Sequence, residues 1–277
     1  MDLVKADLHN HLKTGGWFSR INVNEVIDKA RKRLGSGGVL GVVNFSPTRR
    51  YEDFASFPGY ERQDFGNALY FPNQDIIVVK GEEMETILPS GEQVDLLALG
   101  MNKGQHPKPR RTLDDRLKEI KEMGGILGAD HPFHKDGIGP FLEIHKGYLG
   151  KFDFLEVHNG ECALWLPGYA KANEKALEFF NHVRTQNPAL CNTLGKLVSS
   201  DGHSIYEIGR SNMSLPSISL RNRDSIVSSL RNGMVYAANE NLPCKRHNSY
   251  DGAVDHIAKW VYLKVARKTK IFPTGCL

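Results

Sequence analysis

The sequence has few cysteines and no long hydrophobic run, and both absences narrow the class of protein. Its four cysteines contain no Cys-x-x-Cys pair, so a disulfide framework is not expected and a reducing compartment fits the composition. No apolar run reaches the roughly 18 residues that span a bilayer. Residues 1–7 lack the apolar segment of a signal peptide. We therefore expect a cytoplasmic protein without a membrane segment.

The sequence also has little excess charge of either sign. Its 36 basic and 32 acidic side chains give a formal net charge of +4, which is too small to indicate nucleic-acid binding by itself. Hydrophobic residues make up 40% of the chain, as in ordinary globular proteins. The length of 277 residues fits a single α/β barrel, so two domains need not be assumed.

Apolar runs alternate with amphipathic stretches along the chain. This pattern predicts strands at residues 4–8, 39–45, 75–79, 94–99, 125–129, 152–157, 194–199 and 213–220, and helices at 24–34, 113–123, 169–183 and 223–231. About seven strand–helix units of this kind favour a parallel α/β barrel over an open sheet. The segment 49–72 has little regular pattern and is predicted to be a loop over the site.

The C-terminal part of the chain differs from the rest. Residues 241–277 begin with a polar linker and continue with an apolar stripe at helical spacing. We therefore expect a single-domain barrel over residues 1–240, with a C-terminal helical extension over residues 241–277 that packs on it.

Histidines and carboxylates follow the ends of several predicted strands. His9 and His11 are one residue apart after the first strand, a spacing that points both side chains to one face. Glu83 follows another strand, and a carboxylate with two oxygens can bridge two cations. His131 follows a third strand, and His134 is a weaker ligand candidate three residues later. These residue types are typical ligands of divalent metals.

Two further strands end in polar residues. Glu156 and Asn159 stand at a strand end, where they are expected to bind substrate or to hold the site, and His158 between them is expected to be packed or hydrogen-bonded. Asp201 and His203 follow a later strand. Because barrel strands present their carboxyl ends at one edge, we expect these groups to converge there. Nitrogen and carboxylate ligands suit zinc, manganese or iron.

In this order, the motifs resemble the PHP (polymerase and histidinol phosphatase) family over roughly residues 3–240. The motifs are His9-x-His11, Gly81-x-Glu83, His131-Pro132, Glu156-x-x-Asn159 and Asp201-x-His203. The resemblance implies a distorted (βα)7 barrel and metal-dependent hydrolysis, mostly of phosphate esters.

The resemblance also implies roles for individual residues. A first cation would be held by His9, His11, Glu83 and Asp201. Glu83 would bridge to a second cation, completed by His131 and His134. His203 would serve a third cation or contact the phosphate.

Two stretches depart from the family pattern. Gly15 stands where the family often has Asp, and Asn44-Phe45 stands where the family has Asp-His. Phenylalanine cannot ligate a metal, and asparagine is a weaker ligand than aspartate. The resemblance therefore implies two complete cation sites and an incomplete third.

The expected function is hydrolysis of a small phosphate ester by metal-activated water. Glu83 and Asp201 would act through the metals, and His203 would give a proton to the leaving oxygen. The candidate phosphate clamp is the pair Arg49–Arg50 after the second predicted strand, because a guanidinium matches phosphate oxygens in geometry.

Three other hypotheses remain open at this stage. The same cluster could serve an amidohydrolase. The missing Asp and His could mark a degenerate barrel kept for binding or regulation, with metal as a structural element. A nuclease is a third alternative, in which the basic residues at 264, 267, 268 and 270 contact the backbone, although nucleic acid is less favoured as a partner than a small phosphate ester. The sequence carries no indication of oligomeric state.

Overall fold

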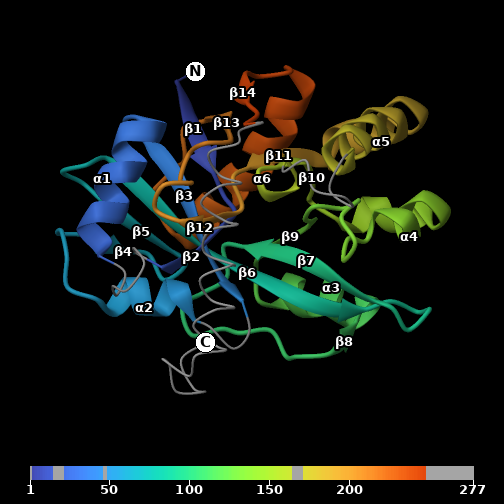
Figure 1. Cartoon of the computed structure of the whole chain (residues 1–277), viewed down its shortest axis with the longest axis horizontal. Helices are drawn as coiled ribbons and strands as arrows, with labels where there is room; N and C mark the ends of the chain where they lie inside the picture. The colour runs from blue at the N-terminus through green and yellow to red at the C-terminus, as the bar shows by residue number, and fades with distance from the viewer. Residues whose placement is uncertain (1, 15–21, 46–48, 164–170, 248–277) are drawn as a thin grey trace, which may run out of the picture.

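A large mixed sheet curls into a nearly closed barrel with helices outside it (Figure 1). The computed structural model describes residues 2–14, 22–45, 49–163 and 171–247. Most of the expected C-terminal extension, and Gly15, lie outside these residues. The main strand order is β11-β10-β9-β7-β6-β3-β1-β13-β14. These strands are β1 Leu3–Asp7, β3 Gly38–Phe45, β6 Ile76–Ile87, β7 Gln93–Leu99, β9 Ile126–Ala129, β10 Phe154–Asn159, β11 Gly195–Ser199, β13 Asn212–Pro216 and β14 Cys244–Lys245.

Helices follow most of these strands and cover the outside of the barrel (Figure 1). They are α1 Val23–Leu34, α2 Arg50–Ser56, α3 Leu113–Glu122, α4 Gly139–Ile144, α5 Ala172–Gln186 and α6 Arg223–Asn239, with 3-10 turns η1 Lys146–Lys151, η2 Glu161–Ala163 and η3 Pro188–Asn192. The side chain of Asn22 accepts from the N–H groups of Asn24 and Glu25 and so caps α1. The helix predicted at residues 223–231 continues in α6 to Asn239.

The prediction of a parallel sheet is wrong at several strand pairs. Strand β7 is antiparallel to both of its neighbours, β6 and β9, and β13 is antiparallel to β1. Only residues 88–92 connect β6 to β7. A connection this short allows a hairpin, whereas a parallel crossover needs a dozen or more residues. The antiparallel β7 is one way in which the barrel departs from a regular parallel one.

The segment 49–72 is not the irregular loop that was predicted. It contains α2 and a short hairpin of β4 Gln63–Asp64 and β5 Ala68–Phe71, and β5 pairs antiparallel with β6. Three of its aromatic residues, Tyr51, Phe54 and Phe71, are fully buried in the core. Each large apolar side chain buried in this way contributes about 1.5–3 kcal/mol to stability. The segment therefore anchors α2 against β3.

Three short strands complete the described structure. Strand β2 Asn10–Thr14 pairs with β12 Gly202–Ser204 in a separate two-stranded sheet, and β8 Arg111–Thr112 pairs with β6. The β2–β12 pair joins the two segments that carry the first and last histidine motifs, so it brings the ends of the motif series together.

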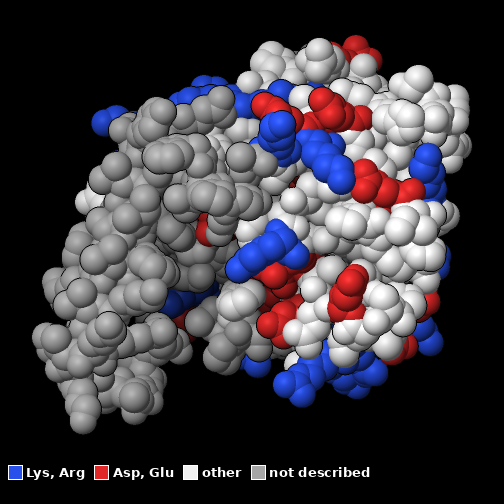
Figure 2. Space-filling view, turned by 45° about the vertical axis from the view of Figure 1, so that its right-hand side comes forward, with Lys and Arg blue, Asp and Glu red and all other residues white. Residues whose placement is uncertain are grey.

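The surface of the described part carries charges of both signs. On the face shown in Figure 2, Lys and Arg side chains are interspersed with Asp and Glu side chains. Within the described residues, no helix is long and apolar enough to cross a membrane.

Candidate metal centre

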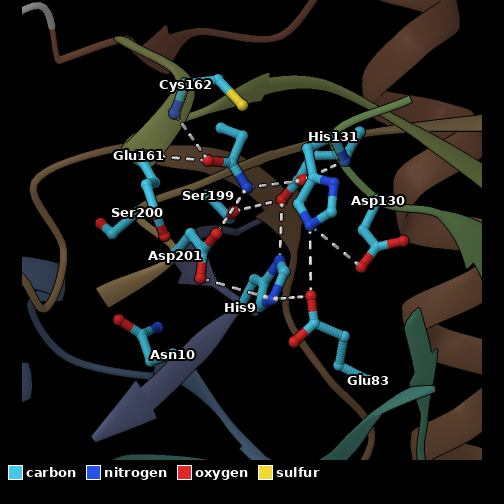
Figure 3. A network of polar contacts seen from close by, with 12 residues as sticks. His9, Asn10, Glu83, Asp130, His131, Glu161, Cys162, Ser199, Ser200 and Asp201 are labelled. Carbon is cyan, nitrogen blue, oxygen red and sulfur yellow. Dashed lines mark hydrogen bonds and ion pairs between the residues drawn. The ribbon is translucent and has the colours of Figure 1, made fainter. Parts of the chain in front are cut away.

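Residues that follow β1, β9 and β11 meet residues of β6 and β10 at one end of the barrel (Figure 3). Glu83 lies inside β6, which continues to Ile87, and not after the end of its strand as predicted. His9, Glu83, His131 and Asp201 are all less than a tenth exposed. Two of these residues have an unusual backbone, with φ of 25° at His131 and 47° at Asp201. Positive φ in residues other than glycine costs about 1–3 kcal/mol and concentrates at functional sites. The chain therefore accepts local strain where these two side chains enter the cluster.

The side chains of this cluster face one another at short distances. His11 Nε2 lies 3.1 Å from Glu83 Oε2 and 3.3 Å from Asp201 Oδ1. His131 Nε2 lies 3.2 Å from Glu83 Oε1, and His9 Nε2 lies 3.2 Å from His11 Nε2. Ligands bound at about 2.0–2.2 Å to one cation are about 3.0–3.4 Å apart when adjacent. These contacts match that spacing.

Glu83 belongs to two groups of possible ligands at once. One group is His9, His11 and Glu83, and another is Glu83, Asp130 and His131; within each, the ligand atoms lie within 4.8 Å of one another. A third group of the same kind is His11, Asp201 and His203. A carboxylate shared by two groups is the arrangement in which one side chain bridges two cations.

The carboxylates dominate the protonation of the buried imidazoles. Burial alone would lower the pKa of His9, but the charges of Asp201 and Glu156 outweigh it and raise this pKa well above its usual value. The pKa of His11 is raised as well, because Glu83 and Asp201 outweigh its burial. Burial likewise would lower the pKa of His131, and it is raised by the charges of neighbouring carboxylates.

The carboxylates of Glu83 and Asp201 shift in the opposite direction, because protonated imidazoles lower their pKa values. Burial would raise the pKa of Glu83, but His11 and His131 hold it well below its usual value. The pKa of Asp201 is also lowered well below its usual value, because His9 and His11 outweigh burial. Both carboxylates are therefore ionised and ready to bind a cation. Metal binding would have to displace protons from the imidazoles.

Several buried atoms of the cluster have no hydrogen-bond partner among the described residues. They are His11 Nδ1, His131 Nδ1, Asp201 Oδ1 and both carboxylate oxygens of Asp130. An unsatisfied buried polar group costs about 1–3 kcal/mol, so a cluster of them calls for an explanation. Burial raises the pKa of Asp130 well above its usual value. Divalent cations would satisfy Asp201 and Asp130 directly, so the residues present fit a metal centre.

Glu156 and Asn159 lie beneath the cluster and are fully buried. Glu156 contacts His9 Nδ1 at 3.2 Å and accepts the backbone N–H of His131 at 2.7 Å. Asn159 donates to Glu156 at 2.9 Å and to Asp201 Oδ2 at 3.1 Å. Of the two roles considered from the sequence, this placement favours holding the site over contacting substrate, because ligand histidines are oriented by such partners.

The other two histidines after strand ends differ in role. His158 is buried, lies 3.2 Å from Ser211 Oγ, and has a pKa lowered to about 4 by its burial. It is thus a packed, hydrogen-bonded histidine, as predicted. His134 lines the pocket with its ring 5.2 Å from that of His131, but it does not enter any of the ligand groups found among the described residues.

Asp95 is a candidate functional residue that the sequence interpretation missed. Strands β6 and β7 pair Glu83 with Leu97 and Glu85 with Asp95, so Asp95 lies one pair along from Glu83 on the same face. Its pKa is raised to about 7 by burial and by the nearby charge of Glu83. A lone acidic residue inside the apolar run 94–99 was the available signal.

The pocket at this end of the barrel has a volume of about 240 Å³. It is lined by His11, Phe45, Glu83, Asp95, His131, His134, Lys135, Asp136, Glu161, Cys162, Asp201 and His203. Lys135 is the one Lys or Arg among these described lining residues. The predicted clamp residues Arg49 and Arg50 are not among them, since they stand at the start of α2.

The two residues that depart from the family pattern have separate roles here. Phe45 lines the pocket, with its ring edge-on to His11 at 6.0 Å. Asn44 is not among the described residues that line the pocket. Its side-chain amide donates to Glu52 and Glu82, which also pair with the buried Lys80. We call Glu52 and Glu82 the outer carboxylate pair. The ammonium of Lys80 contacts both carboxylates and supplies the positive charge between them.

Solved structures with the same fold support this architecture. PsfC from Pseudomonas syringae PB-5123 has a TM-score of 0.60 and 13% identity, covering 96% of this chain and 99% of that one. The lesion-specific endonuclease PfuEndoQ from Pyrococcus furiosus has a TM-score of 0.53 and 14% identity, covering 88% and 57%. Endonuclease Q in complex with a 27-mer duplex substrate with an abasic lesion has a TM-score of 0.51 and 13% identity, covering 88% and 58%.

These comparisons concern the fold alone, because the identities are low. This chain spans just over half the length of the endonuclease chains. No protein-family model and no curated protein sequence matches it. Together with the nearly closed mixed barrel and the buried His, Glu and Asp clusters, the structural neighbours confirm the predicted fold: the chain has the distorted α/β barrel of the PHP type.

Proposed function

We propose that this chain is a metal-dependent hydrolase that cleaves a phosphate ester at a dinuclear centre. The observation that carries the proposal is the position of Glu83 between two ligand groups. Its Oε2 faces His11 at 3.1 Å, and its Oε1 faces His131 at 3.2 Å. A single buried carboxylate with imidazoles on both oxygens is arranged to bridge two cations.

The proposed ligands follow from the contacts. The first cation would be held by His9, His11, Glu83 and Asp201. The second would be held by Glu83, Asp130 and His131, with Asp95 or His134 from the pocket wall as a further ligand. When bound, such cations supply a water of lowered pKa as nucleophile and offset the charge that develops on the substrate oxygens.

The protein itself would orient the groups around the reacting atoms. Glu156 and Asn159 fix His9, His131 and Asp201 through hydrogen bonds, so the ligands are held before substrate arrives. His203 lines the pocket, and its Nδ1 lies 2.9 Å from the carbonyl oxygen of Asp201. In the proposed reaction the opposite nitrogen of His203 gives a proton to the leaving oxygen.

Recognition of the phosphate would depend largely on the cations. Carboxylates outnumber the single ammonium of Lys135 in the pocket lining, so the metal-free pocket repels an anion. Lys135 is the proposed protein contact to the phosphate, since Arg49 and Arg50 lie outside the lining. Binding of a phosphate ester should therefore require the loaded centre.

The same pocket supports a second candidate function, a metal-dependent amidohydrolase. The observation that favours it is the scarcity of cationic side chains around the cluster, because an uncharged amide needs no phosphate clamp. A nuclease receives less support. The described part of the face in Figure 2 mixes basic with acidic side chains and so offers no continuous basic track.

The test is a substrate panel with the metal-loaded protein. The protein is freed of metal with a chelator, reloaded separately with Mn²⁺ and Zn²⁺, and assayed on phosphomonoesters, phosphodiesters and amides. Turnover of a phosphate ester that disappears with chelation supports the proposal. Turnover of amides alone would favour the second candidate. Bound metal without any turnover would favour a binding or regulatory protein.

A further inference from the structure

A second pocket adjoins the pocket of the metal centre. It has a volume of about 140 Å³ and shares Phe45 and Glu83 with the first pocket, and its lining includes Lys108, Arg110 and Arg116. We call it the side pocket. A water molecule takes about 30 Å³ of the liquid, so this space can hold a small polar group. A ligand with its reacting end at the cations could therefore extend past Phe45 into the side pocket.

The side pocket has more cationic side chains than the pocket of the metal centre. Lys108 and Arg110 both line it, and both are exposed. Within the residues that the structure describes, neither side chain forms an ion pair, and the hydrogen bonds of Lys108 are made by its backbone. The next residue, Arg111, instead pairs with Asp115 and lines neither pocket. Lys108 and Arg110 can thus receive an anion.

The carboxylates in the lining of the side pocket do not cancel this positive charge. Glu82 already pairs with Lys80 and His106, at 3.3 and 2.7 Å. Glu83 belongs to the proposed metal ligands, so bound cations would offset its charge. Glu85 is exposed, where solvent and salt screen its charge. An anion in the side pocket therefore meets two cations and little opposing charge.

Buried contacts hold Lys108 in place before any ligand arrives. Its backbone N–H donates to Glu119 Oε1 at 2.9 Å, and its carbonyl oxygen accepts from Arg116 Nη2 at 2.9 Å. Arg116 is fully buried, and its Nη1 donates to Glu119 at 2.6 Å. The rings of Pro107 and Pro109 restrict the backbone on both sides of Lys108. A loop fixed in this way loses little conformational entropy when it binds a ligand.

Arg110 lies at a strained turn beside β6. Its φ is 51°, a conformation that residues other than glycine rarely adopt and that concentrates at functional sites. Strand β8 begins at the next residue and pairs with β6, where Arg111 is opposite Thr86 (Figure 1). Thr86 is three residues along the strand from Glu83, a distance of about 10 Å. Because the long Arg110 side chain covers part of this distance, a short carbon chain can join an anion there to a phosphate at the cations.

We propose that Lys108 and Arg110 bind a second anionic group of the substrate, a carboxylate or a further phosphate on its organic part. A guanidinium and an ammonium both suit the oxygens of such groups. The inference rests on the proposed function, because the first phosphate would lie at the metal centre. It narrows the substrate from phosphate esters in general to those that carry a second anion a few carbon atoms away.

The test compares esters that differ only at the far end. The full chain is loaded with Mn²⁺ and assayed for phosphate release from alkyl monophosphates of two to four carbons that end in a methyl group, a carboxylate or a second phosphate. The readout is the ratio of kcat/KM between the anionic-ended and the methyl-ended ester of the same length. Wild type is compared with Lys108→Met, Arg110→Gln and the matched control Arg111→Gln, which removes a neighbouring arginine outside both pockets.

In the wild type and in Arg111→Gln, kcat/KM should be about tenfold higher for the best anionic-ended ester than for its methyl-ended counterpart, because the added contacts are charge-assisted but partly exposed. This ratio should fall toward one in Lys108→Met and in Arg110→Gln, and it should decrease in the wild type as salt is added. A general folding defect would lower the rates for both esters without removing their ratio. Preference for the carboxylate or for the second phosphate would identify the anion that is bound.

Two results would overturn the inference and leave the proposed function intact. One is a wild-type ratio near one at every chain length, and the other is a preference that persists in both Lys108→Met and Arg110→Gln. Absence of phosphate release from every ester would overturn the proposed function and this inference together.

Discussion

The substitution Glu83→Gln is the sharpest perturbation of the proposed centre. Glutamine has nearly the same shape as glutamate, so the packing of β6 should be retained. The change removes one negative charge from a side chain that is 8% exposed and contacts His11 and His131 at 3.1 and 3.2 Å. Both proposed cations lose their shared carboxylate at once.

The size of the effect follows from these two contacts. A hydrogen bond or ligand contact to a charged group is worth about 1.5–3 kcal/mol. Glu83 makes one such contact on each oxygen, so the loss is about 3–6 kcal/mol, or roughly a hundredfold to ten-thousandfold in cation affinity. Turnover should fall with metal occupancy, because the nucleophile depends on the bound ions.

The assay is calorimetric titration of metal-free protein with Mn²⁺, followed by activity at saturating metal. The matched control is Glu85→Gln, which makes the same change two residues along β6 at an exposed position. We expect the control to bind metal as the wild type does. If Glu83→Gln kept wild-type affinity for both ions, the bridging role of Glu83 would be wrong, whatever its effect on turnover.

Three further predictions concern the surroundings of the cluster. Asp95→Asn should weaken the second cation by about tenfold to a hundredfold while sparing the first, as measured by stepwise titration, if Asp95 completes that site. Cation affinity should rise with pH, because neighbouring carboxylates raise the pKa of His9 and a bound cation must displace the proton on its ring. The affinity should increase about tenfold per pH unit for each proton released, as measured by titration at pH 6, 7 and 8. The raised pKa stabilises the metal-free protein at low pH, and this contribution is lost as pH rises through the folded-state value, so the gain in Tm on adding metal should grow with pH. Lys80→Met should lower the free energy of unfolding by about 1.5–3 kcal/mol in urea titration, because it removes the ammonium that pairs with Glu52 and Glu82 and leaves them only their contacts to Asn44 and His106, while metal stoichiometry stays unchanged.

The central strands and the clustering of the candidate ligands could be predicted because their signals are local. An apolar run followed within a few residues by His, Asp or Glu indicates both a strand and the polar side chains near its carboxyl half, although Glu83 lies inside β6 and not after it. His9, His11, Glu83, His131 and Asp201 were found in this way, and the structure brings them together. These side chains converge because the carboxyl ends of parallel strands lie at the same edge of the barrel.

Features that depend on pairing between distant segments could not be predicted this way. Asp95 reaches the pocket near the start of β7, because that strand runs antiparallel to β6, and its direction is set by a hairpin and not by its own residues. Glu161 reaches it through a 3-10 turn whose position depends on hydrogen bonds to Asn159. Arg49 and Arg50 follow a strand end, but α2 begins there and carries them outside the pocket lining.

Helix and loop boundaries were likewise predicted well where local residues mark them and poorly where they depend on tertiary packing. The capped α1 and the helix before Gly124 were predicted closely, because capping residues and a glycine with φ of 71° mark their ends locally. The aromatic segment 49–72 was read as a loop because its short elements carry no clear period. Its order comes from burial of Tyr51 and Phe54 under the rest of the fold.

The most direct measurement is the anomalous diffraction of crystals grown with Mn²⁺, recorded on both sides of the manganese absorption edge. The account predicts two strong peaks that both contact Glu83, one shared with His9, His11 and Asp201 and one shared with His131. Absence of peaks at Glu83 would contradict it, and so would metal bound only at the outer group of Glu52, Glu82 and His106, where Lys80 already provides the positive charge.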